Sequence, residues 1–168
     1  LLAGYWVSKG DPFWTYSGGL AGIITASAGN DLYHPIQSMI IAGIGTYIAY
    51  KMHYWVERKF KIDDAVGAVA VHGYAGVVGL IICGFVLWGY PSSGYDGLGY
   101  AAINPVGMII GAFIMFVVLG FIPGYVIAKI LHAAGKLRIP REVELAGLDY
   151  NIMEAASKDE KAVSSSNR

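Results

Sequence analysis

The sequence predicts an all-α membrane protein, a bundle of transmembrane helices. The first indication is composition, because the 168 residues are 55% hydrophobic and only 14% charged, whereas soluble domains carry about 25% charged residues. The formal net charge is zero, which argues against a nucleic-acid-binding surface. The single cysteine, Cys83, leaves no disulfide framework and no cysteine zinc cluster.

The second indication is the length of the segments without Asp, Glu, Lys or Arg. These runs cover residues 12–30, 32–50, 65–95 and 97–128. Because a helix needs roughly 20 apolar residues to cross the hydrocarbon core, we expect four spans, near residues 13–29, 35–55, 65–89 and 103–132. The opening LLAGYWVSK resembles the end of an earlier span, so we expect the chain to be part of a larger membrane protein.

The third indication is the placement of basic residues. Lys and Arg are absent from residues 10–50 and 62–128, whereas residues 51–61 hold four of them. Four more lie at the end of the last span or after it: Lys129, Lys136, Arg138 and Arg141. Since basic loops stay in the cytoplasm, the pattern predicts a membrane part over residues 1–133. Residues 134–168 then form a cytoplasmic tail whose polar end is disordered.

His72 is the main candidate functional residue. It has no charged residue within seven positions on either side. If residues 65–89 form one continuous helix, His72 lies about 12 Å beyond Asp64 and near mid-membrane. A polar ring at that depth should face the bundle interior or a water-filled path. The alternative is a histidine that only packs and forms a hydrogen bond.

Small residues surround His72 on the predicted helix. One face carries Ala65, Ala68, His72, Ala75, Gly76 and Gly79, and Gly73 adjoins it. Ala68, Gly73, Gly76 and Gly79 therefore either pack a neighbouring helix closely or line a narrow pore in which His72 is the one polar group. Asp63 is expected as the helix N-cap and Asp64 in the first turn. Their role is either capping alone or shaping a cytoplasmic vestibule.

Haem ligation is a weaker interpretation of His72, because a membrane b-type haem needs paired histidines at similar depth. His34 lies at the predicted outer edge, and His53 and His132 lie near basic residues at the inner edge. None matches the expected depth of His72. The sequence also shows no nucleophile triad, phosphate loop or metal-ligand cluster, so we expect neither an enzyme nor a cofactor.

Three segments resemble the ammonium transporter family (Amt, MEP and Rh). They are GGLAGIITASAG, DDAVGAVAVHG and LHAAGKLRIPREVELAGLDY, in that order. The resemblance implies the last four of about eleven helices, in a homotrimer with one narrow hydrophobic pore per subunit. Two histidines line that pore and share a hydrogen bond, and His72 matches the second. Ammonium is deprotonated and ammonia crosses, whereas the first histidine, the aromatic gate and the outer ammonium site belong to earlier helices.

The resemblance also implies a location and partners. The protein would take up nitrogen across the cell membrane, with lipids around it and its C-terminus in the cytoplasm. A PII-type regulatory protein would dock at the tail, although the tail reads YNIMEA after Asp149, where the family usually has His-Gly-Glu. An ammonium sensor that signals through the tail is the alternative, but the tail is short for a signalling domain. A generic membrane anchor leaves His72 unexplained.

Overall fold

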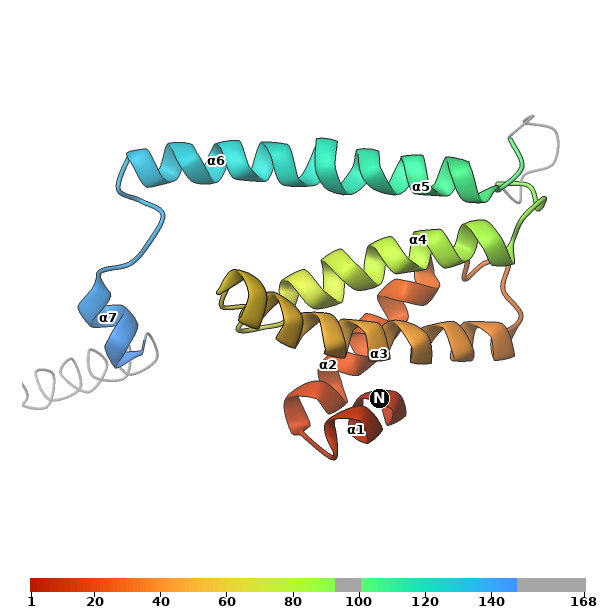
Figure 1. Ribbon diagram of the computed structural model, residues 1–168, viewed down its shortest axis with the longest axis horizontal. Helices are drawn as coiled ribbons and strands as arrows, with labels where there is room; N and C mark the ends of the chain where they lie inside the picture. Colours follow the sequence, from red (N-terminus) through yellow and green to blue (C-terminus); the bar gives the residue numbers. More distant parts are fainter. Residues whose placement is uncertain (93–100, 148–168) are drawn as a thin grey trace, which may run out of the picture. The chain divides into compact units, whose positions relative to one another are not determined.

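The computed structural model describes residues 1–92 and 101–147 (Figure 1). The chain divides into two units, Leu1–Gly120 and Phe121–Arg168, and each is described by itself. The helices of the first unit are α1 (Leu2–Ser8), α2 (Pro12–Ser27), α3 (Pro35–Phe60), η1 (Val69–Tyr74), α4 (Ala75–Val86) and α5 (Pro105–Phe113), with the start of η2 (Ile114–Phe121). The second unit holds α6 (Ile122–Ala133) and α7 (Arg141–Ala146).

Three helices begin with a proline that follows a capping residue. The Asp11 carboxylate accepts a hydrogen bond from the Trp14 amide, at 3.1 Å, at the start of α2. The Asn104 side chain accepts from the Gly107 amide, at 2.7 Å, at the start of α5. His34 caps α3 in the same way, accepting from the Ile36 amide at 3.3 Å. Proline suits the first helical position because it has no amide hydrogen that needs a partner. The residues around each of these three starts are therefore enough to explain why a helix begins there.

Helix length bears on the predicted membrane spans. Two helical segments in the described part of the chain, Val69–Val86 and Pro105–Ala133, are long and apolar enough to cross a membrane by length and composition. α2 has 16 residues and is about 24 Å long, short of the roughly 30 Å hydrocarbon core. α3 has 26 residues and carries the basic pair Arg58 and Lys59 in its last turn. The spans near 13–29 and 35–55 are therefore helical but stay predictions as membrane spans.

Glycines bring α1, α3 and α4 into close contact with α2. A Cβ atom added at Gly18 of α2 would lie 2.8 Å from the Cα atom of Gly4 in α1 and 2.8 Å from Cγ2 of Thr46 in α3. A Cβ atom added at Gly79 of α4 would lie 2.9 Å from the Cα atom of Thr25 in α2. Such close approach is typical of helix packing in membranes, where dispersion contacts hold helices together.

Two buried threonines lie at these crossings. Thr46 Oγ1 lies 2.6 Å from the Gly18 carbonyl oxygen and 2.9 Å from that of Ala42, so its hydroxyl links α3 to α2. Thr25 Oγ1 donates to the Ala21 carbonyl of its own helix at 2.8 Å. Buried hydroxyls are costly without a partner, and each of these has one.

The helix predicted over residues 65–89 differs from the structure at its start. It is unbroken at Gly73 and Gly76, but it begins at Val69, and its first six residues, Val69–Tyr74, are π-helical. The chain before it turns at Gly67, whose φ angle is +70°. A left-handed φ angle cannot continue a right-handed helix, and this is why the helix starts later than its hydrophobic run.

Two glycines of α3 offer a matched test of the packing. A Cβ atom added at Gly45 would lie 2.6 Å from Cγ2 of Thr25, whereas one added at Gly43 meets no atom within 4 Å. We expect Gly45→Ala to lower the free energy of unfolding by about 1–3 kcal/mol through overpacking. Gly43→Ala should leave it unchanged or raise it by up to about 1 kcal/mol, because alanine favours helix.

The measurement is thermal unfolding of the two variants in the same detergent, followed by circular dichroism. Equal midpoints for Gly45→Ala and Gly43→Ala would contradict the close packing of α2 on α3.

Candidate functional site

The candidate site lies where the chain enters the helix that carries His72. The Asp64 side chain is buried, with 5% of its residue surface exposed. Its Oδ1 atom accepts from the Val69 amide at 3.0 Å, and its Oδ2 atom accepts from the Ala70 amide at 3.2 Å. The Gly67 amide also donates to the Asp64 carbonyl at 2.8 Å. Asp64 therefore satisfies the free amides at the helix start, where a negative charge is favoured.

The expected capping roles of the two aspartates were wrong in detail. Asp63 lies six residues before the helix and is exposed, so it is not the N-cap. Asp64 is outside the first turn and caps it from five and six residues away. The reason is the turn at Gly67, which folds the chain back so that the first amides point at Asp64.

His72 is the fourth residue of the Val69–Val86 helix. It therefore lies nearer to the start of this helix than to its middle, because the turn uses up residues that were expected to be helical. The side chain is exposed, and within the described part of the chain it has no hydrogen bond or ion pair. The described helices thus do not bury it as a packing histidine. It lies in a π-helical segment, and such segments often occur at functional sites.

The small face predicted around His72 does not stay on one side. Gly79 is buried against Thr25, and Gly76 faces the Phe116 ring, 2.8 Å from an added Cβ atom. Ala68 is exposed and Gly73 has open space. A residue inserted by a π turn rotates all later positions by about 100°. Residues before and after the π segment therefore face different directions.

Sequence reasoning missed a buried histidine beside Asp64. His53 in α3 is 6% exposed, and its Nδ1 atom lies 3.5 Å from Asp64 Oδ2. Its Nε2 atom lies 3.4 Å from Glu57 Oε1. The spacing of His53 and Glu57, four residues apart on a helix, was a signal available in the sequence. Nothing local indicated the contact with Asp64.

Of the other two histidines, His34 lies at the start of α3 and His132 belongs to the second unit. The His34 ring caps α3 at its start, and His132 is exposed in α6. Among residues 1–92 and 101–147, no group of three or more His, Cys, Asp or Glu side chains is placed to hold a metal ion.

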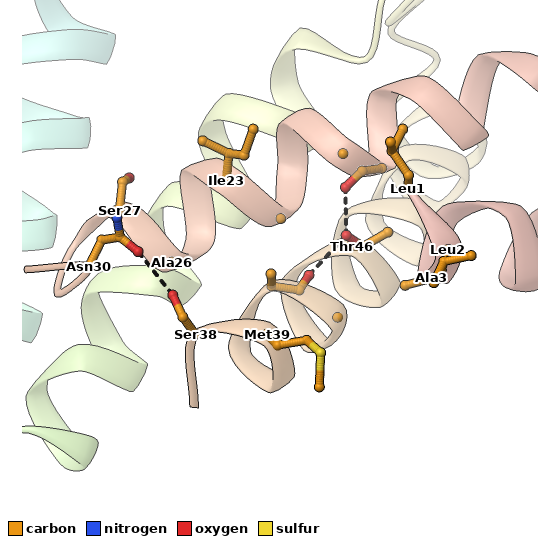
Figure 2. A pocket seen from close by; sticks show the side chains of 15 residues that line it. Leu1, Leu2, Ala3, Ile23, Ala26, Ser27, Asn30, Ser38, Met39 and Thr46 are labelled. Atoms are coloured by element: carbon orange, nitrogen blue, oxygen red, sulfur yellow. Dashed lines mark hydrogen bonds between the residues drawn. The ribbon is translucent and has the colours of Figure 1, made fainter. Parts of the chain in front are cut away.

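A separate apolar groove of about 870 Å³ runs along α2 and α3 and reaches the start of the chain. Figure 2 shows Ile23 and Ala26 from α2, Met39 and Thr46 from α3, and the first residues, Leu1–Ala3, around it. Its polar end is marked by the Ser38 hydroxyl, which donates to Asn30 Oδ1 at 3.0 Å. His72 does not line this groove, so the groove and the candidate site are distinct.

Comparison with known proteins agrees with the sequence resemblance. Residues 2–158 match the model of the Ammonium Transporter Family. The chain is 32% identical over 164 residues to ammonium transporter Amt1 of Methanocaldococcus jannaschii. The aligned residues cover 96% of this chain and 39% of that protein. It is 38% identical over 146 residues to Amt2 of the same organism, covering 84% of this chain and 32% of that protein.

A third relative is the ammonium transporter of Bacillus subtilis, 34% identical over 137 residues, with 81% of this chain and 34% of that protein covered. No solved structure matches. The chain therefore spans between 32% and 39% of the length of these three relatives. Because the family model covers nearly the whole chain, we conclude that this protein belongs to the ammonium transporter family.

Proposed function

We propose that this chain forms part of a pore that moves ammonium, as ammonia, across the cell membrane, with His72 lining the path. The observation that carries the proposal is the family match over residues 2–158. His72 supports it, because it is the one His, Asp, Glu, Lys or Arg of the apolar Val69–Val86 helix and its side chain is exposed.

The physical reason for deprotonation is the cost of charge in an apolar path. An isolated ion is far more costly to move into a low-dielectric medium than a neutral molecule. Ammonium that gives up a proton before the path crosses as ammonia. A histidine suits such a path because each ring nitrogen either donates or accepts a hydrogen bond. His72 with a second histidine from another helix would then line the path as a hydrogen-bonded pair.

The rest of the transporter follows from the same proposal. A homotrimer in the lipid bilayer would hold one pore per subunit, and the outer ammonium site and aromatic gate would lie on helices outside this chain. The basic segments near Lys51 and Lys136 would face the cytoplasm. The tail would then be cytoplasmic and accessible to a PII-type protein. Its last residues, 148–168, lie outside the described residues.

Replacing His72 by aspartate in the full-length protein tests its place in the path. A carboxylate holds a cation by Coulomb attraction in a low-dielectric path and keeps water around it. We expect the ratio of potassium to methylammonium uptake to rise by about tenfold or more, equivalent to about 1.4 kcal/mol. The measurement is uptake of both ions in cells that lack other ammonium transporters, normalised to surface expression.

His132→Asp is the matched control, since His132 is exposed in α6 near the basic end and outside the proposed path. It should exclude potassium as the parent does. A His72→Asp protein that is normally expressed and still excludes potassium would remove His72 from the path.

The 168-residue chain alone should not transport. It spans at most 39% of the length of the three relatives above, and the His72 side chain is exposed. A pore wall that is open on one side exposes polar groups to lipid. Proteoliposomes that contain this chain should take up methylammonium at the rate of empty liposomes, and uptake clearly above that rate would contradict the proposal of a shared pore.

A further inference from the structure

The Asp64 carboxylate is the buried acid of the described residues, and its surroundings explain how it is tolerated. A buried charge is costly unless it is paired and hydrogen-bonded. Two backbone amides, of Val69 and Ala70, supply hydrogen bonds. The one side chain that supplies a facing polar nitrogen is His53, whose Nδ1 atom lies 3.5 Å from Oδ2. Among the described residues this buried Nδ1 atom forms no hydrogen bond, and the Asp64 carboxylate is the polar group that lies opposite it.

Neighbouring rings hold the His53 ring in place. Its centroid lies 5.2 Å from that of Trp14, in an edge-to-face arrangement, and 5.0 Å from that of Tyr54. The Phe13 ring lies 5.9 Å away. Both nitrogens therefore face carboxylates, Nδ1 facing Asp64 and Nε2 facing Glu57.

This arrangement links α3 to the helix of His72. The amides that Asp64 accepts from belong to the first two residues of the π segment, and His72 follows two residues later. A shift of the Asp64 carboxylate therefore shifts the start of this segment. We infer that His53 is a positioning residue for transport, which acts through Asp64 to place His72 in the path. The inference rests on the proposed function, because it presumes that His72 lines that path.

Packing alone is a poor explanation for the histidine. An apolar ring at position 53 would fill the same space among Trp14, Tyr54 and Phe13 without burying two polar nitrogens. It would also leave Oδ2 of Asp64 with the Ala70 amide as its one polar neighbour among the described residues. The polar ring is explained if its Nδ1 atom steadies Asp64.

Two amide substitutions separate the two nitrogens in the full-length protein. In His53→Asn the side-chain amide nitrogen stands near the place of Nδ1 and can donate to Asp64. In His53→Gln it stands near the place of Nε2 and faces Glu57. Both remove the ring, and both leave a neutral amide in a buried helix position. A role in packing alone would affect them alike.

The readout is methylammonium uptake and potassium leak in proteoliposomes made from purified protein, so that expression does not enter. We expect His53→Asn to keep the KM for methylammonium and the exclusion of potassium within about twofold of the parent. We expect His53→Gln to lose selectivity or maximal rate by about 10-fold to 100-fold, the scale of a displaced functional group. His34→Asn is the control, because His34 caps the far end of α3 and asparagine is a good cap.

Equal behaviour of His53→Asn and His53→Gln, whether both are active or both inactive, overturns the inference. A second measurement adds Asp64→Asn, which removes the charge and keeps one acceptor oxygen. If His53 acts through Asp64, then His53→Gln changes uptake by less than about twofold in the Asp64→Asn background, and full additive losses overturn the inference. The two proposals can fail separately. If His72→Asp loses potassium exclusion while the two His53 variants behave alike, this inference is overturned and the proposed function is supported.

Discussion

Backbone contact between helices, made possible by glycine, is the constraint on which the first unit depends. Gly18 of α2 meets α1 and α3 at one level, and Gly79 of α4 meets the backbone of Thr25 in α2. Helices that touch at the backbone have almost no freedom to slide, because any added side-chain atom would collide. The position of α4, and with it the helix of His72, follows from the Gly79 contact.

The π segment and the Asp64 cap depend on that placement. Once α4 is docked on α2 at Gly79, the chain from α3 must return to its start within residues 61–68. The turn at Gly67 makes this return and leaves the first amides pointing at Asp64. The helix then begins as a π-helical segment over Val69–Tyr74. His72 lies in this segment, where the backbone departs from regular α-helical geometry.

Incomplete burial of apolar helices is consistent with membership of a membrane family. The Val69–Val86 helix has a mean hydropathy of 2.0, yet only 33% of it is buried within the described structure. Large side chains such as Phe85 and Trp88 are exposed. Contiguous exposed apolar surface is costly in water and marks contact with lipid or with other helices. The relatives are more than twice as long as this chain.

The sequence by itself determined the class of protein and the helical segments, because hydrophobic length and charge distribution are sums over neighbouring residues. It also singled out His72 and the family resemblance, since a lone histidine in a long run without Asp, Glu, Lys or Arg can be recognised from neighbouring residues. Only the tertiary structure decided that Asp64 and not Asp63 is the cap, that the helix starts at Val69, and that His53 faces Asp64. These features depend on the direction in which a turn points its amides and on which side chain of another helix lies opposite. The contact of His53 with Asp64 joins α3 to the segment before the next helix, and the direction of the amides depends on the φ angle of one residue, Gly67. Hydrophobic periodicity predicts neither.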